Sequence, residues 1–207
     1  MTVRKILLFI LCIVVCPAFA AAQDEKIFQG YSGGMMLHAG YLFGENTLAP
    51  KSPQGATFGI GGAIRVHLWK HFRLGTEGYM SNMPMQTTDC RNDLQKGSYI
   101  RYGWGGLLAD ACWRMDKVWP YVGATVGGGT VKSLYIVDGS QNDWKAEPQT
   151  IFNKRGFVCL APFVGCDYLL TPRVHLTFKA DWMLAFGSGK LLMPTGLRAY
   201  IGFMFCH

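Results

Sequence analysis

The sequence predicts an all-β protein, an antiparallel up-and-down transmembrane β-barrel of eight strands, and three observations support this fold class. From Gly30 onward, segments of alternating polarity are separated by polar breaks. The breaks are alternately long and very short, as in barrels whose loops lie at one end and whose turns lie at the other. The composition is poor in charge and rich in glycine and aromatic residues, which suits strands that meet lipid on one face.

The composition also favours membrane strands over membrane helices. Charged residues make up 16% of the 207 residues, against about 25% in typical soluble domains, and 26 residues are glycine. After residue 22, no apolar stretch reaches the roughly 20 residues that a membrane-spanning helix needs. Crossing by strands is therefore the expectation.

Residues 1–22 have the pattern of a cleaved signal peptide. Arg4 and Lys5 form a basic start, an apolar run follows, and small residues precede two candidate cleavage points, after Ala20 and after Ala22. The expected organisation therefore has three parts: a signal peptide over residues 1–22, a short lead over residues 23–29 and one barrel domain over residues 30–207.

Charge and cysteine usage exclude two classes of function. The formal net charge is +7, but Lys and Arg are spread singly without a run, so nucleic acid is not an expected partner. Five cysteines remain after the signal peptide, an odd number that predicts mostly free thiols. No CxxC or Cys/His spacing occurs, so neither a metal nor another cofactor is predicted.

The first three strands are expected at residues 31–43, 56–69 and 72–81. Because side chains alternate between the faces of a strand, residues of one parity share a face. In the second strand, Phe58 and Ile60 fall on the face assigned to lipid, whereas Arg65 faces inward. In the third strand, Leu74 faces outward and Glu77 inward.

The fourth strand, at residues 98–114, changes parity. Tyr102 and Trp104 share one parity, but the later apolar residues, including Leu107 and Trp113, have the other. Because Gly105-Gly106 lies at the change, the sequence predicts a β-bulge there.

The remaining strands are expected at residues 118–137, 152–169 and 173–186, and the eighth follows Pro194. In the eighth, Leu197 and Ile201 fall on one parity and Arg198 on the other. With an N-terminus on the periplasmic side, the long breaks after strands one, three, five and seven face outward. Aromatic residues expected in a girdle near the periplasmic end are Trp69, Phe72, Trp113, Trp119, Tyr168 and Phe205.

Polar residues of the inward parity form the main candidate site. They are Arg65, Arg73, Glu77, His175, Lys179, Asp181 and Arg198, together with His67 and with His38 above them. An eight-stranded barrel is only wide enough for side chains to fill, so charges inside it must pair. A three-residue turn at residues 70–72 would place Arg65 opposite Glu77. The prediction is an internal salt-bridge network, and an ion- or proton-conducting lumen is the alternative.

Two further function classes stay open. A lipid A-modifying enzyme would need His175 and Asp181 together with Ser188, in a register that the sequence does not determine. No GxSxG motif occurs, and the expectation is a protein without catalytic residues. A soluble lipocalin-like barrel would instead place its apolar face inward, around a ligand.

The long breaks are the expected binding elements, because loops on a rigid scaffold commonly carry function. Trp144, beside Asp143 and Lys145, could contact a glycan, a host surface or lipopolysaccharide, or it could lie flat on the membrane surface. The expected role is non-enzymatic, either structural or a surface contact made by the extracellular loops. Outer-membrane lipids surround such a barrel.

The chain resembles the small eight-stranded outer-membrane barrels that include OmpA and OmpX. It looks most like uncharacterised barrels of the Bacteroides type, at residues 31–38 (YSGGMMLH) and 202–205 (GFMF). The resemblance covers about residues 27–207, implies the outer membrane of a Gram-negative bacterium and brings no catalytic motif. Such barrels commonly end on an aromatic residue, whereas here Cys206 and His207 follow Phe205.

Overall fold

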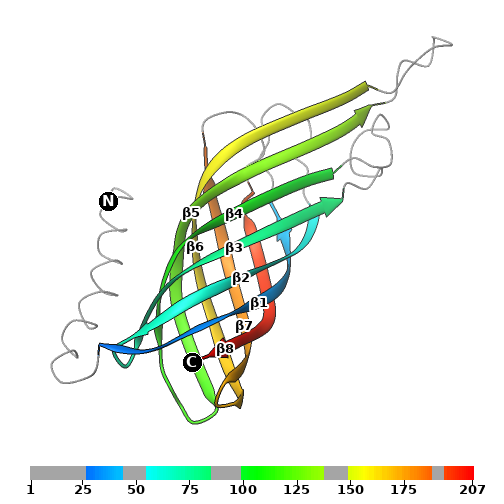
Figure 1. Ribbon diagram of the computed structural model, residues 1–207. Helices are drawn as coiled ribbons and strands as arrows, with labels where there is room; N and C mark the ends of the chain where they lie inside the picture. The colour runs from blue at the N-terminus through cyan, green and yellow to red at the C-terminus, as the bar shows by residue number, and fades with distance from the viewer. Residues whose placement is uncertain (1–26, 44–54, 85–98, 138–148, 188–193) are drawn as a thin grey trace, which may run out of the picture.

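A computed structural model describes residues 27–43, 55–84, 99–137, 149–187 and 194–207. They form one closed antiparallel barrel in which each strand pairs with its neighbours in sequence and β1 pairs with β8 (Figure 1). The strands are β1 (Phe28–Leu42), β2 (Gly55–Leu68), β3 (Phe72–Pro84), β4 (Tyr99–Cys112), β5 (Val118–Val137), β6 (Gln149–Thr171), β7 (Val174–Phe186) and β8 (Gly196–Cys206). The predicted fold class is confirmed, whereas the predicted signal peptide lies outside the described residues.

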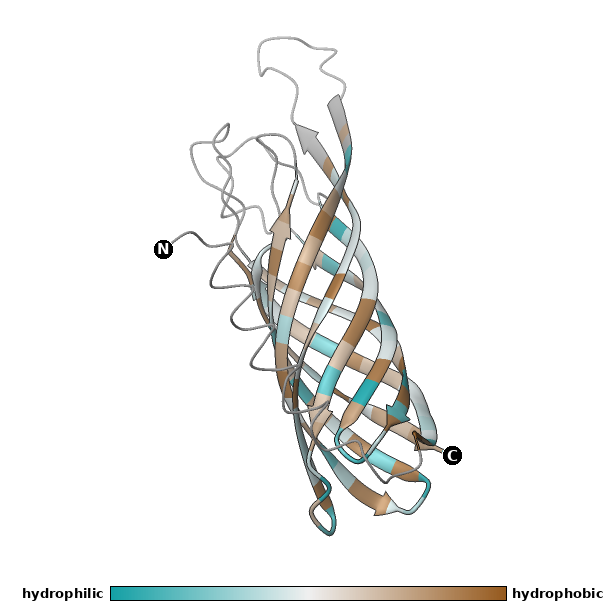
Figure 2. Ribbon diagram, turned by 90° about the vertical axis from the view of Figure 1, so that its left-hand side faces the viewer, coloured by the Kyte–Doolittle hydropathy of each residue, from teal (hydrophilic) through white to brown (hydrophobic). Residues whose placement is uncertain are grey.

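The polarity of the barrel is the reverse of that of a water-soluble protein. Large apolar side chains cover the outside, as at Leu107 (76% exposed) and Met35 (64% exposed), while charged side chains are buried inside. Apolar and polar residues alternate along the strands in Figure 2, and β1, β2, β3, β7 and β8 have the predicted faces. Among the described residues, no helix is long and apolar enough to cross a membrane.

The short connections gather at one end of the barrel. They follow β2, β4 and β6, and the start of β1 and the end of β8 lie at the same end. There the backbone of His207 pairs with that of Tyr31, so the last residue is held in the sheet. Of the predicted girdle residues, Trp113, Tyr168 and Phe205 are exposed on the outside. Trp119 instead turns inward and packs against His175.

The bulge predicted at Gly105-Gly106 is wrong. β4 pairs with β3 and β5 without a register shift, with Gly105 opposite Gly78 and Gly106 opposite Glu77. Tyr102 and Trp104 do share a face, but that face is the inside of the barrel, where both are buried. The sequence suggests a change of parity because the large side chains of the first half of β4 are aromatic residues that fill the lumen. The large side chains of its second half are apolar residues that face outward.

Glycines on facing strands make room for these inward rings. Gly129 pairs with Trp104, Gly61 with Tyr79 and Gly165 with Tyr121. A Cβ atom at Gly165 would collide with the ring of Tyr121, and one at Gly61 with that of Tyr79. Large and small residues thus alternate around the lumen, as expected where a narrow barrel is filled by side chains.

We expect Gly165→Ala to destabilise the barrel by about 1–3 kcal/mol, because the added methyl group displaces the Tyr121 ring. Chemical unfolding of the refolded barrel in detergent micelles measures this loss. Gly103→Ala is the matched control, since a Cβ atom there meets its nearest atom, the Tyr79 carbonyl oxygen, only at 4.0 Å. Equal stability of the two variants would contradict the proposed fit between glycine and ring.

Candidate functional site

Among the described residues, eight charged side chains are buried inside the barrel, in equal numbers of each sign. Four are cations and four are carboxylates, and none is more than 3% exposed: Arg65, Arg73, Lys179, Arg198, Glu77, Asp110, Asp167 and Asp181. The structure therefore places all six charged residues of the predicted network inside. Their formal charges balance once Asp110 and Asp167, which the sequence analysis missed, are included.

The cluster nearer the short turns is built around Arg73 on β3. Its guanidinium donates to Asp110 on β4 at 2.6 Å and to Asp167 on β6 at 2.7 Å. Thr177 on β7 donates to the other oxygen of Asp167 at 2.7 Å. One cation thus connects two strands that are not neighbours in the sheet.

Arg65 completes this cluster without a hydrogen bond of its own. It lies 3.6 Å from Asp110 and 3.9 Å from Asp167, and its side chain is fully buried. The guanidinium stacks over the ring of Tyr121, with 4.7 Å to the ring centroid, and Arg73 lies over the same ring at 4.6 Å. Two arginines therefore share two carboxylates and one aromatic ring.

The predicted pairing of Arg65 with Glu77 is wrong by two residues. Arg65 lies opposite Gly75, and Glu77 lies opposite Ala63. The turn consists of residues 69–71 rather than 70–72, because Trp69 adopts a left-handed conformation with φ of 50° and Leu68 pairs with Phe72. Both residues still face inward, but each finds its partners across the lumen.

The second cluster is centred on Lys179 of β7 and Glu77 of β3. The ammonium donates to both carboxylate oxygens, at 2.7 and 2.6 Å, and Thr125 on β5 donates to one of them at 2.6 Å. Lys179 also lies 3.7 Å from Asp181, as the proximity of these two residues on one strand face predicts. The ring of Phe163, 4.6 Å from the ammonium, covers it.

Asp181 links this cluster to Arg198 on β8. The guanidinium binds both carboxylate oxygens at 2.8 Å, and the Tyr200 hydroxyl donates to one of them, also at 2.8 Å. Trp104 stacks on the guanidinium at 4.4 Å. His38 lies at this level and forms a hydrogen bond with Ser81 at 2.7 Å.

Beyond these clusters, toward the long connections, the lumen is filled by apolar side chains. Those buried there are Leu42, Met83, Ile100, Tyr102, Val131, Phe157 and Met183. The interior therefore consists of paired charges in its lower and middle parts and of an apolar plug above them. This packing fits an eight-stranded barrel, whose lumen side chains can fill.

The two missed carboxylates could have been found from parity. Asp110 has the parity opposite to that of Leu107 and Trp113, the outward-facing residues of its half of the strand, so parity places it inward. Asp167 lies on β6, for which the sequence analysis assigned no faces. An excess of cations among the predicted inward residues was the signal that more carboxylates were needed.

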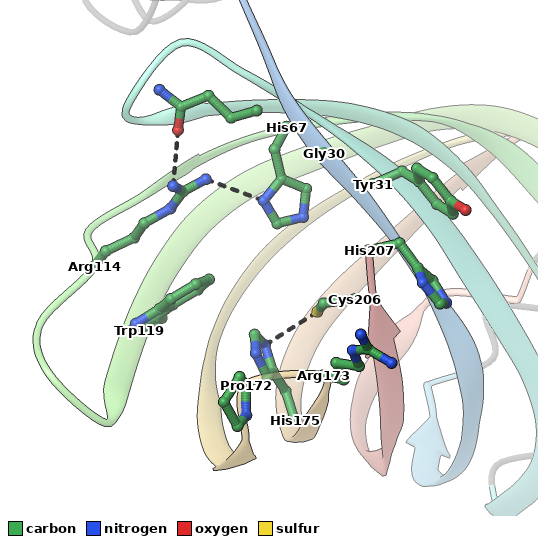
Figure 3. A pocket seen from close by; sticks show the side chains of 11 residues that line it. Gly30, Tyr31, His67, Arg114, Trp119, Pro172, Arg173, His175, Cys206 and His207 are labelled. Carbon is green, nitrogen blue, oxygen red and sulfur yellow. Dashed lines mark hydrogen bonds between the residues drawn. The ribbon is translucent and has the colours of Figure 1, made fainter.

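The mouth at the short-turn end contains a pocket of about 520 Å³ (Figure 3). His67, Arg114 and His175 line it, and Arg114 binds His67 at 3.2 Å and Gln29 at 2.7 Å. His175 forms a hydrogen bond with the thiol of Cys206 at 3.4 Å. Among the described residues, no group of three or more His, Cys, Asp or Glu side chains is arranged to hold a metal ion.

The geometry does not assemble the catalytic group considered for a lipid-modifying enzyme. His175 lies in the mouth beside Cys206 and Trp119, whereas Asp181 lies six residues further along β7 and is held by Arg198. Ser188 and Trp144 both lie outside the described residues. His175 is thus an inward residue, as predicted, but it belongs to the mouth rather than to the salt-bridge clusters.

The sequence matches no protein-family model and no curated protein sequence. The fold is nevertheless that of known outer-membrane barrels. Neisserial surface protein A aligns with a TM-score of 0.53 at 12% identity, over 85% of this chain and 96% of its own. OprG of Pseudomonas aeruginosa aligns with a TM-score of 0.54 at 11% identity, over 89% and 98%.

A third solved structure is that of Ail, the attachment invasion locus protein of Yersinia pestis, in complex with the heparin analogue sucrose octasulfate. It aligns with a TM-score of 0.50 at 11% identity, over 86% of this chain and 99% of its own. These similarities establish the barrel architecture of the predicted resemblance. The relation to Bacteroides-type barrels stays a prediction.

We expect Glu77→Gln and Lys179→Met each to destabilise the barrel by about 3–5 kcal/mol, because each leaves one buried charge without its partner. The double variant removes one charge of each sign, so its loss of stability should be smaller than the sum of the losses of the two single variants. Chemical unfolding in detergent micelles, run as a double-mutant cycle, measures the coupling. Strictly additive losses would show that the two side chains do not stabilise the barrel as a pair.

Proposed function

We propose that this chain is a non-enzymatic barrel of the Gram-negative outer membrane, exported by its signal peptide, whose role is structural or lies in surface contacts. The barrel wall is embedded in lipid, the lumen is closed, and the long connections face the cell exterior. The observation that carries this proposal is the reversed polarity of the barrel, apolar outside and charged inside.

The height of the uncharged wall supports membrane insertion. On β5 the outward residues from Val118 to Thr130 carry no charge, and the first outward charge is that of Lys132. At about 3.3 Å per residue and a tilt of about 40°, this stretch spans roughly 30 Å along the barrel axis. That height matches the apolar band of outer-membrane barrels and the hydrocarbon core of a bilayer.

The same polarity argues against a soluble lipocalin-like barrel. Such a protein buries apolar side chains around a ligand and exposes its charges to water. Here the charges line the lumen, and the outer wall exposes residues such as Leu107, Met35 and Val158. A surface of this kind in water would be a large apolar patch, which soluble monomers rarely carry.

The packing of the lumen supports a non-conducting barrel over a conducting one. Glu77 is held by Lys179 and Thr125, and Asp181 by Arg198 and Tyr200, so each of these carboxylates is already paired within the lumen. An ion crossing the barrel would have to separate these pairs and then pass the apolar plug. Both steps are costly where water is excluded.

A role in surface contacts follows from the position of the long connections. The four of them join strand ends that lie opposite the short turns, and Trp144 belongs to one of them in the sequence. We propose that they contact an extracellular ligand or a host surface. The complex of Ail with a heparin analogue supports this proposal only by analogy of fold.

We expect the full chain expressed in a Gram-negative host to fractionate with the outer membrane and to shift on a gel after boiling, because a closed barrel resists detergent until it is heated. Cell fractionation followed by electrophoresis of unboiled and boiled samples provides the test. A protein that is soluble in the periplasm and shows no shift would refute membrane insertion.

We expect the refolded barrel to produce no conductance steps in a planar lipid bilayer, because paired charges and the apolar plug fill the lumen. The single variant Lys179→Met serves as the comparison, since it breaks one ion pair without adding bulk. Regular discrete openings of the unmodified protein would contradict the closed-lumen proposal and favour the conducting alternative.

A further inference from the structure

Three cations form a row across the outer wall, near the end of the barrel that carries the long connections. Arg101 on β4 pairs directly with Lys132 on β5, and Lys132 pairs directly with Lys154 on β6. All three side chains are exposed. Residues paired across antiparallel strands point to the same face, and the buried neighbours of Lys132 identify that face as the outside.

Within the described strands, these three are the only charged side chains on the outward face. The other charged residues of the strands have the inward parity, and all of them are buried except Arg155, which pairs with the buried Val131 but is itself exposed near the end of the barrel. The cations are therefore not part of a generally charged surface. They lie side by side on three adjacent strands.

The row is unfavourable by itself, because like charges directly opposite each other in a sheet repel. The part of the chain that the structure describes offers no carboxylate to any of the three. Arg101 lies over the ring of Tyr99, 5.2 Å from its centroid, which orients the guanidinium but leaves its charge unbalanced. An anion outside the protein would remove the repulsion.

The level of the row indicates where that anion lies. On β4 the outward residues between Arg101 and Trp113 are uncharged, and on β5 those between Lys132 and Val118 are uncharged. The β5 stretch spans roughly 30 Å, as calculated above, and the β4 stretch from Gly103 to Trp113 spans about 25 Å at the same tilt, which is the height of the apolar band of outer-membrane barrels. The cations therefore follow the apolar band directly, at the depth of lipid headgroups.

The wall below the row is flat and then apolar. The next outward residues toward the membrane centre are Gly103, Thr130 and Gly156, which pair with one another in register. Below them the wall carries large exposed apolar side chains, with Leu107 76% and Val126 59% exposed. A molecule that bridges the row would thus meet cations at its upper end and a smooth apolar surface beneath.

We propose that Arg101, Lys132 and Lys154 bind the phosphate groups of a phosphorylated glycolipid in the outer leaflet, with its acyl chains lying along β4–β6. This inference rests on the proposed membrane insertion. Charge complementarity selects an anion, and the lateral position of the row, continuous with the apolar wall, selects a lipid rather than a polymer approaching from water.

The test uses the full mature chain refolded into phosphatidylcholine vesicles, with diphosphorylated lipid A as the added probe. The variant Arg101→Gln/Lys132→Gln/Lys154→Gln removes the row. The matched control, Lys70→Gln/Lys117→Gln/Arg173→Gln, removes three exposed cations at the opposite end and changes the net charge equally. Thermal unfolding, followed by the gel shift at increasing probe content, reports binding to the folded state.

We expect lipid A to raise the unfolding temperature of the unmodified protein and of the control, while the row variant binds about a hundredfold more weakly, or about fivefold for each cation. Dephosphorylated lipid A should have no such effect on any of them. Without the probe, the row variant should be at least as stable as the unmodified protein, because the like-charge repulsion is gone.

Three results would overturn the inference. An equal response of the row variant and the control would show that these residues do not bind the lipid. An equal rise of the unfolding temperature with phosphatidylglycerol would show that the row binds anionic lipids in general rather than a phosphorylated glycolipid. A shift produced by a soluble sulfated polysaccharide, with none produced by lipid A, would assign the row to an extracellular polymer.

Failure of the inference is separable from failure of the proposed function. If the unmodified protein does not enter phosphatidylcholine vesicles and shows no gel shift, membrane insertion itself is wrong. If all variants insert and fold but lipid A stabilises them equally, the proposed membrane insertion is supported and only the proposed glycolipid site is refuted.

Discussion

The rest of the structure depends on the pairing of buried charges across the lumen. The ion pair between Lys179 and Glu77 joins β7 to β3, and that between Arg73 and Asp167 joins β3 to β6, although β3 is a neighbour of neither β6 nor β7 in the sheet. Backbone hydrogen bonds connect each strand only to the next. The ion pairs across the lumen therefore constrain the width and roundness of the barrel, which the backbone hydrogen bonds between neighbouring strands do not do by themselves. An ionised group without its partner in this water-poor interior would cost several kcal/mol, so the pairs act as a set.

This constraint explains why glycine and aromatic residues share the interior with the charges. Rings cover the cations, as Tyr121 covers Arg65 and Trp104 covers Arg198, and exclude water from the pairs. A lumen formed by eight strands has little space for such rings, and glycine on the facing strand supplies it. The high glycine content thus has a structural cause. It does not indicate a phosphate-binding loop, which needs a following helix that the described strands do not provide.

The sequence alone was sufficient to assign the lumen-facing side chains on strands where apolar and polar residues alternate strictly. On β2, β7 and β8 every second residue is apolar, so the parity rule assigned Arg65, Lys179, Asp181 and Arg198 to the lumen correctly. The rule failed on β4, because an aromatic residue suits either a lipid-facing wall or a filled lumen. It also could not give the register between β2 and β3, which depends on the left-handed conformation of Trp69. Partners across the lumen depend on register and on the curvature of the whole barrel, so the pairing of Arg73 with Asp110 and Asp167 could be read only from the closed structure.

The rule that charges must be paired also applies to the outer wall, where the surroundings change with depth. A charge on the lipid-facing wall is tolerated only near the headgroups, where phosphates can neutralise it. The described strands obey this limit, since their outward charges are confined to Arg101, Lys132 and Lys154, all beyond the apolar band. At the opposite end, cations such as Lys70 and Lys117 lie in turns rather than on the wall. The two ends therefore differ in what their cations can reach. The turn cations lie at the mouth of the barrel, whereas the wall cations of β4–β6 point outward from the sheet, next to the apolar band, where the headgroup phosphates that we propose as their partner would lie.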